Sequence, residues 1–385
     1  MLRRFRDMSD SEIEVSGQSA ATDPETAVRE ALSSLGRALA AKGGAPFHLS
    51  SMEWLAADLS AFDPKRHVLD LAFREVLGGF RPPITVVKTD KPVLAIRARA
   101  VLPLASTEPV WHGYALPELA REYSPRGQVP NMDALFAQWS RDGLAFCAGR
   151  SGLDIAYGAS PYERLDLFRP THGVATPPLW VFIHGGYWQA SDKYQHAQFA
   201  AGMLQAGYAV ANLNYGLCPD VPLEGIVSQI RSALKFLVAN SQELGFDPAS
   251  IHVAGHSAGG HLAGMVASDD TMPSVLSALL LSGLFDLTPL ALLPVGRLTG
   301  VTTPQAIARL SPMKRKARSG VKTGIGVGGL ESDEFKWQSA ELARIWNVPS
   351  PLVIPNENHF SLLDGLIKGG LLDFALETAG GRRSR

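Results

Sequence analysis

The residues best suited to chemistry in this chain are Gly255-His256-Ser257-Ala258-Gly259, because of what surrounds them. The preceding run, Ile251–Ala254, has the composition of a buried strand, and the following run, Gly260–Met265, has that of a helix. A strand, a sharp turn and a helix in this order form a nucleophile elbow, in which a strained turn exposes a serine hydroxyl above the edge of a sheet. We therefore predict that Ser257 is a nucleophile that attacks a carbonyl carbon.

An oxyanion hole is predicted upstream of this serine. The apolar run Leu179–Ile183 is typical of a fully buried parallel strand, and it ends in His184-Gly185-Gly186-Tyr187-Trp188. Acyl transfer builds a full negative charge on the carbonyl oxygen, which preorganised N–H groups must meet. Paired glycines let the backbone come close to a substrate, and the residue after the nucleophile supplies a further N–H group. We expect Gly185, Gly186 and Ala258 to donate these groups.

A general base and an acid are expected elsewhere in the chain, after the serine. His359 follows the short strand candidate Pro351–Pro355, and we predict that it is the base. The acid is expected after the glycine-rich strand candidate Thr323–Gly329, where Glu331 comes first and Asp333 follows. Its carboxylate must hold the imidazole Nδ1–H and stay ionised. We favour Glu331 as the acid, keep Asp333 as the alternative, and expect the other carboxylates there to lie at a helix N-terminus.

Several segments of the chain resemble the kynurenine formamidases (arylformamidases), which have the α/β-hydrolase fold. They are His184–Trp188, Gly255–Leu262, Ser282–Leu287 and Asn358–Phe360, together with Glu122–Pro125, which is similar to a motif that precedes the catalytic domain of these enzymes. The resemblance extends from about Leu119 to Ala375, and the Tyr-Trp pair after His-Gly-Gly is its most specific part.

The resemblance implies Ser257 as nucleophile, His359 as base, and Gly185 and Gly186 as oxyanion donors. It also implies an N-formyl aryl amine such as N-formylkynurenine as substrate, with formate and the free amine as products. The family's acid segment, Asp-Ser-Pro-Glu-Phe followed by Gln-Ser, differs here, because Glu331 stands in the place of the aspartate. Glutamate is an accepted acid in this fold.

Side chains beside the predicted oxyanion hole are candidates for the substrate pocket. Tyr187 and Trp188 could form an aromatic wall for an aryl ring, or they could pack in the core. His184 and Phe360 flank the same site and are assigned to the pocket as well. We interpret three further histidines as scaffold: His252, His256 and His261.

Composition and charge exclude several classes of function. The 385 residues include 36 basic and 37 acidic side chains, a net charge of −1, and 46% are hydrophobic, enough for one large core and a further module. This balance argues against nucleic acid or an anionic membrane as a partner. The basic opening Met1–Asp7 is not followed by the apolar run of a secretory signal. The longest apolar stretch, 278–295, is interrupted by Asp286, Pro289 and Pro294. A membrane span would not tolerate these interruptions.

The two cysteines, Cys147 and Cys218, are too few for a disulfide framework and show no metal-ligand spacing. We therefore expect a cytoplasmic enzyme that needs no metal or organic cofactor. Its expected partner is a small-molecule substrate, and a homodimer is possible.

Residues 116–385 are predicted to form an α/β-hydrolase domain, with a mostly parallel central sheet and helices on both faces. A helix is expected over Glu224–Ala239, and another around Met132. The segment 288–318 is interpreted as a cap over the active site, and its basic run, Lys314–Arg318, as a solvated face. The strand candidates are Asp154–Tyr157, Leu165–Phe168, Leu179–Ile183, Ala209–Leu213, Ile251–Ala254, Ala278–Ser282, Thr323–Val327 and Leu352–Ile354.

Residues 1–115 are predicted to be an N-terminal α+β extension without catalytic motifs. A helix is expected after Asp23-Pro24, a second after Ser51 and a third over Val68–Leu77. Ile84–Lys88 and Val93–Val101 are interpreted as a β-hairpin. The extension could contribute to dimerisation or substrate access, or it could have no catalytic part.

These inferences predict a serine hydrolase that cleaves an N-formyl aryl amide through an acyl-enzyme. The nearer alternative is a carboxylesterase that acts on small acyl esters with the same triad. The further alternative is a non-catalytic relative that binds a ligand in the same pocket.

Overall fold

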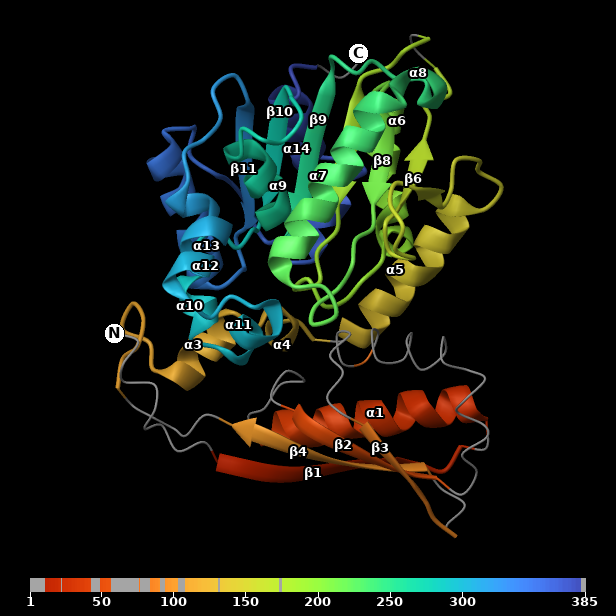
Figure 1. Cartoon of the computed structure of the whole chain (residues 1–385), viewed down its shortest axis with the longest axis vertical. Coiled ribbons are helices and arrows are strands. Elements are labelled where there is room, and N and C mark those ends of the chain that lie inside the picture. The colour runs from red at the N-terminus through yellow and green to blue at the C-terminus, as the bar shows by residue number, and fades with distance from the viewer. Residues whose placement is uncertain are drawn as a thin grey trace. The chain divides into compact units, whose positions relative to one another are not determined.

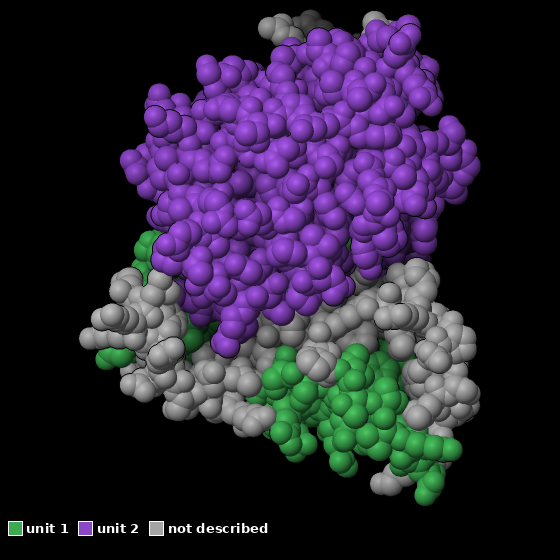
Figure 2. All heavy atoms as spheres, viewed as in Figure 1, with its two compact units in different colours: residues 1–120, 189–191 green, residues 121–188, 192–385 purple. Residues whose placement is uncertain are grey.

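The computed structural model describes residues 11–21, 23–42, 49–56, 76, 84–90, 94–102, 108–130, 132–172 and 175–381. The chain divides into two compact units, one of residues 1–120 and 189–191 and the other of residues 121–188 and 192–385 (Figure 2). No helix in the described ranges combines the length and apolar character that crossing a membrane requires. The roles predicted for the two regions stay predictions.

The larger unit is built on an eight-stranded sheet in the order β12-β11-β10-β9-β7-β8-β6-β5. Strands from β12 to β8 run parallel, and β6 and β5 are antiparallel to their neighbours. Every predicted strand of this region is present, within a few residues of its expected bounds. In chain order the strands are β5 (Ile155–Ala156), β6 (Arg164–Phe168), β7 (Leu179–Ile183), β8 (Ala209–Leu213), β9 (Ile251–His256), β10 (Ser277–Leu281), β11 (Lys322–Gly328) and β12 (Leu352–Ile354).

Helices cover both faces of this sheet, as predicted (Figure 1). On one face α9 (Ala258–Ser268) packs on β7, β9 and β10, beside α7 (Leu223–Ala239). On the other face, aromatic side chains of β7, Trp180 and Phe182, share a core with residues of α14 (Gly370–Thr378). Outside the segment between β10 and β11, the other helical elements described for this unit are α4 (Pro125–Gln128), α5 (Met132–Cys147), η3 (Lys193–Ala200), α6 (Ala201–Gln205), α8 (Ser241–Leu244), α13 (Asp333–Trp346) and η5 (Ser361–Leu366).

The segment between β10 and β11 is helical. It contains α10 (Thr288–Ala291), α11 (Pro294–Thr299), α12 (Pro304–Leu310) and the 3₁₀ turn η4 (Pro312–Lys314). Each begins with proline in its first turn, where the missing N–H has no intrahelical partner to lose. Its predicted role as a cap stays a prediction.

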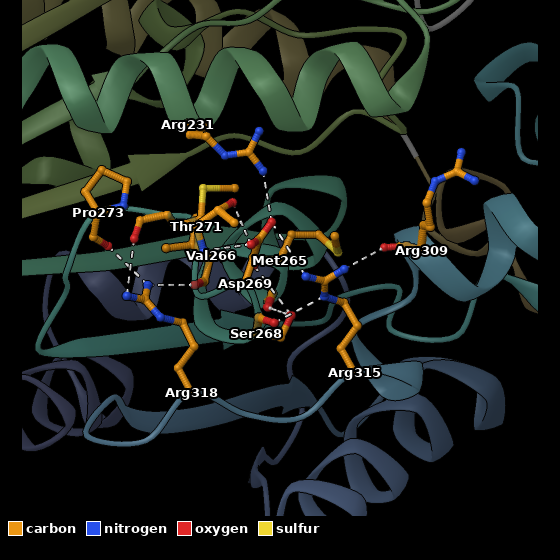
Figure 3. A network of polar contacts seen from close by, with 12 residues as sticks. Arg231, Met265, Val266, Ser268, Asp269, Thr271, Pro273, Arg309, Arg315 and Arg318 are labelled. Carbon is orange, nitrogen blue, oxygen red and sulfur yellow. Dashed lines mark hydrogen bonds and ion pairs between the residues drawn. The ribbon is translucent and has the colours of Figure 1, made fainter.

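The basic run Lys314–Arg318 is only partly the solvated face that we predicted, because Lys314 and Lys316 are exposed and the two arginines are not. The side chains of Arg315 and Arg318 are only 26% and 12% exposed, and both bind the end of α9 (Figure 3). Arg315 donates to the carbonyl of Ser268 at 3.2 Å and lies 3.6 Å from Asp269, which also binds Arg231 at 2.9 Å. Cations at a helix C-terminus complement its macrodipole. The arginines therefore stabilise the helix that begins at the predicted nucleophile.

This network predicts a pH-dependent contribution to stability. Burial opposes ionisation of Asp269, but hydrogen bonds from Thr271 and Arg231 and the charge of Arg315 outweigh it, so the pKa of Asp269 is lowered. A lowered folded-state pKa gives stability that is present above the unfolded-state pKa and is lost as pH falls through the folded-state value. We expect Asp269→Asn to lower the free energy of unfolding by about 2 kcal/mol at pH 7.

Urea unfolding of wild type and Asp269→Asn over a pH series measures this effect. The difference between the two should shrink as the solution becomes acidic. Asp270→Asn is the matched control, because the Asp270 side chain is 95% exposed and should contribute little. A difference for Asp269→Asn that is the same at neutral and acidic pH would contradict the assignment.

The smaller unit has a four-stranded sheet in the order β1-β4-β2-β3 and the helix α1 (Pro24–Ala41). The predicted stripe of α1 is confirmed, because all four of its apolar residues are at most 1% exposed: Val28, Leu32, Leu35 and Leu39. The strands are β1 (Ser11–Ser19), β2 (Leu49–Ala56), β3 (Ile84–Lys88) and β4 (Leu94–Leu102). The helix α3 (Leu116–Glu122) follows them in the chain.

Two predictions for this unit are wrong. The residues after Ser51 form strand β2, in which Met52, Trp54 and Ala56 are buried in alternation, the period of a strand. β3 and β4 do not form a hairpin, because β3 pairs in parallel with β2, and β4 lies between β1 and β2. The predicted helix over Val68–Leu77 lies outside the described residues except at residue 76.

Candidate active site

The predicted nucleophile elbow is present at the end of β9. Ser257 has φ 57° and ψ −118°, a conformation that non-glycine residues rarely adopt, and its N–H donates to the carbonyl of Leu281 at 2.8 Å. A Cβ on Gly259 would lie 1.9 Å from the carbonyl oxygen of Ile183, so only glycine fits where the elbow meets the end of β7. These neighbours hold the strained serine in place.

The His-Gly-Gly loop lies beside this serine. A Cβ on Gly185 would come within 3.0 Å of the Ser257 Cβ, and Gly186 has φ 112°. In the turns, loops and helix caps of the described residues, the N–H groups of Gly185, Gly186 and Ala258 donate no hydrogen bond to a main-chain carbonyl. Gly185 thus lies against the serine, Gly186 follows Gly185 and Ala258 follows the serine, and their role as oxyanion donors stays a prediction.

The acid and the base meet in the structure. His359 Nδ1 donates to Glu331 Oε2 at 2.6 Å, and the two residues are only 4% and 5% exposed. The other carboxylate oxygen, Oε1, accepts from the N–H of Gly328 at 2.7 Å and from the hydroxyl of Ser282 at 2.5 Å. Sequence reasoning missed Ser282, although it opens one of the segments that carry the family resemblance.

The alternative prediction, that Asp333 is the acid, is wrong, because His359 pairs with Glu331. The side chain of Asp333 is 79% exposed and pairs with Lys336 in the first turn of α13, so it cannot reach the imidazole of His359. Glu334 lies in the first turn of α13, as expected; its side chain is 2% exposed and accepts a hydrogen bond from the hydroxyl of Tyr123 at 2.8 Å.

The histidine inside the elbow has a supporting contact with the base. His256 Nε2 donates to the main-chain oxygen of His359 at 2.7 Å, and the two ring centroids are 4.7 Å apart. Burial, with a smaller effect from the nearby His359, holds the pKa of His256 well below its usual range. A neutral imidazole that fixes the His359 loop agrees with its interpretation as scaffold. His252 and His261 likewise bind within the protein, to Ser277 Oγ and the carbonyl of Leu310.

The residues predicted to line the substrate pocket differ in their surroundings. Trp188 is 0% exposed and its ring lies edge-on to the ring of His261, so Trp188 packs in the core. His184 is 1% exposed and stacks on Tyr215 with ring centroids 4.4 Å apart. Tyr187 is half-buried, and Phe360, 9% exposed, packs against Phe136 and Trp139.

A cavity of about 190 Å³ opens beside the base, lined by both Glu331 and His359. None of the four predicted pocket residues lines it. Its other walls come from the segment around α4 and from residues near the acid: Pro125, Gln128, Val129, Pro130, Leu330, Ser332, Phe335 and Asn358. No group of three or more His, Cys, Asp or Glu side chains in the described ranges is placed to hold a metal ion.

The strand order, the strained serine and the carboxylate–histidine pair define an α/β-hydrolase. The BD-FAE family model matches residues 165–278. Kynurenine formamidases of Salmo salar and Danio rerio are 27% and 28% identical to the chain, over 67% of it and 94% and 93% of their own lengths. A Silicibacter protein named as a thioesterase has a crystal structure with a TM-score of 0.60 and 29% identity, covering 66% of this chain and 96% of that one. The chain is a hydrolase with the α/β-hydrolase fold, and it is similar to the kynurenine formamidases over two thirds of its length.

The geometry predicts unequal effects for neighbouring carboxylates. We expect Glu331→Gln to lower kcat by about a thousandfold or more, because an amide can hold the imidazole in the wrong tautomer and cannot stabilise the imidazolium. Steady-state kinetics with an amide or ester that the wild-type enzyme hydrolyses will measure the loss of kcat. Asp333→Asn, two positions away and exposed, should keep wild-type kcat. Equal losses in the two variants would show that Glu331 is not the acid.

Proposed function

We propose that this enzyme is a serine hydrolase that cleaves N-formyl aryl amides through a formyl-enzyme. The observation that carries the proposal is the 2.6 Å contact of His359 with Glu331, together with a strained Ser257 that lies against Gly185. This is the set of groups that acyl transfer requires: a nucleophile, an oriented base and donors for the oxyanion.

The first half of the reaction forms the ester and releases the amine. His359 Nε2 takes the proton of Ser257 as its Oγ attacks the formyl carbon, and the C=O electrons move to the oxygen. The N–H groups of Gly185, Gly186 and Ala258 hold this oxyanion. As the tetrahedral intermediate collapses, the C–N bond breaks and the imidazolium gives its proton to the leaving amine. Glu331 stays ionised throughout and stabilises the imidazolium.

Water completes the reaction by the same route. His359 accepts a proton from a water molecule, which attacks the formyl ester carbon. The second tetrahedral intermediate expels Ser257 Oγ, which regains its proton from His359, and formate leaves. Each group returns to its initial state, so the cycle needs no further reactant.

The aryl formamide is favoured over other substrates for two reasons. The relatives that match most of the chain are named kynurenine formamidase. The cavity beside His359 has apolar walls, from Pro125, Val129 and Phe335 among others, against which an aromatic leaving group can pack.

The second candidate is a carboxylesterase that uses the same residues on small acyl esters. It is favoured by the name of the Silicibacter protein, since thioesters and esters share the acyl-transfer route. A non-catalytic ligand-binding relative is the third candidate. The presence of Ser257 in a strained turn and the contact of His359 with Glu331 favour turnover.

A comparison of two substrates tests the choice between amide and ester. We expect kcat/KM to be higher for N-formylkynurenine than for p-nitrophenyl acetate, because the aromatic leaving group of N-formylkynurenine should pack against the apolar walls of the cavity. A large preference for the ester would establish the carboxylesterase instead. Failure of wild type to turn over either substrate, or to react with a fluorophosphonate, would favour the non-catalytic relative.

The serine mechanism predicts that Ser257→Ala loses activity by several orders of magnitude, because it removes the hydroxyl that forms the ester. The same variant should no longer react with a fluorophosphonate probe. Ser268→Ala is the matched control, because it removes a buried hydroxyl from the same helix, where Oγ donates to the carbonyl of Gly264. Full formamide hydrolysis by Ser257→Ala would refute the mechanism.

A further inference from the structure

A buried tyrosine outside the triad binds the helix that follows the acid. Tyr123, which stands between α3 and α4, is 3% exposed. Its hydroxyl donates to Glu334 Oε2 and accepts from Gln338 Nε2, both at 2.8 Å. Glu334 and Gln338 are four residues apart on α13, so they lie on one face of that helix. The hydroxyl thus holds the beginning of α13, which starts two residues after Glu331.

The main chain of the same tyrosine binds the oxyanion loop. The hydroxyl of Tyr187 donates to the carbonyl oxygen of Tyr123 at 2.5 Å. Tyr187 directly follows Gly186 and has φ 54°, a left-handed conformation that costs energy for a side chain with a Cβ. A strained loop needs such outside contacts to keep one geometry.

The network continues to the second partner of the acid. Gln338 Oε1 accepts from the N–H groups of Phe285 and Asp286, each at 2.7 Å, and so fixes the turn after β10. That turn begins with Ser282, whose hydroxyl donates to Glu331. The residue before Tyr123 is also joined to the start of α13, because the hydroxyl of Ser332 donates to the carbonyl of Glu122 at 2.8 Å.

We propose that Tyr123 is a positioning residue that couples the oxyanion loop to the elements that carry the acid. It touches neither Ser257 nor the reacting atoms, and it acts through Tyr187 on one side and through α13 on the other. The proposal rests on the proposed function, because it assigns the loop at Gly186 to oxyanion binding. Displacement of such a loop by even a fraction of an ångström weakens the contacts that form only in the transition state.

Tyr187→Phe tests the first half of the coupling, since it removes one hydroxyl and keeps the ring. We expect kcat to fall by about tenfold, with KM changed less than about twofold, because the lost contact supports transition-state binding. The affinity for a boronic acid, which forms a tetrahedral adduct with the serine, should fall by a similar factor. A general loss of structure would instead lower the melting temperature and the active fraction, which titration with a fluorophosphonate counts.

Tyr123→Phe and the double variant test the second half. If Tyr123 joins the two elements, the double variant should lose no more kcat than the worse single variant. Losses in kcat that multiply would show two independent contacts and overturn the coupling. If Tyr123→Phe fails to fold, Gln338→Leu replaces it in the cycle with the same expectation. Thr299→Val is the matched control, because it removes a buried hydroxyl that donates to the carbonyl of Val295 at 2.9 Å.

The outcomes separate this inference from the proposed function. The variants are compared on whichever substrate the wild-type chain turns over, since the oxyanion is common to amides and esters. Unchanged kcat and unchanged boronic acid affinity in Tyr187→Phe, with an active wild type, would overturn the inference alone. An inactive wild type would overturn both.

Discussion

The hydrogen bond between Glu331 and His359 is the interaction on which the rest of the site depends. A carboxylate that is 5% exposed has lost most of its water and must find its hydrogen bonds inside the protein. It finds them in His359, Ser282 and the N–H of Gly328. These partners stand after β12, after β10 and at the end of β11, so three neighbouring parallel strands must end at the same edge of the sheet. The nucleophile follows the next strand, β9.

Backbone strain gathers at that edge. Ser257, Ser282 and Tyr187 all have positive φ, at 57°, 47° and 54°. Each such residue costs on the order of 1–3 kcal/mol, and it persists only where the surroundings determine it fully. The packing of Gly259 on β7, the contact of Ser282 with Glu331 and the contact of Tyr187 with Tyr123 supply that determination. Strain and hydrogen bonding thus place the reactive groups together.

Much of the catalytic unit could be predicted from the sequence, because buried parallel strands leave continuous apolar runs such as Leu179–Ile183. Order along the chain then assigned the serine, the histidine and Glu331. The smaller unit was harder. β2 carries an alternating pattern that is short enough to be taken for a helix, and the pairing of β3 depends on contacts between distant segments. The roles of Ser282 and Tyr123 were missed as well, although both stand in segments that carry the family resemblance, because sequence does not show which side chain a hydroxyl will orient. The prediction of a solvated face was wrong for Arg315 and Arg318, because charge alone does not show that a helix end lies nearby.

The central claim is that the acyl group passes through an ester on Ser257. Rapid-quench mass spectrometry of the full chain mixed with N-formylkynurenine or p-nitrophenyl acetate tests it most directly. The peptide that contains Ser257 should gain the mass of one formyl or acetyl group during turnover and lose it as product accumulates. Product formation with that peptide unmodified, or with the acyl group on another residue, would contradict the account.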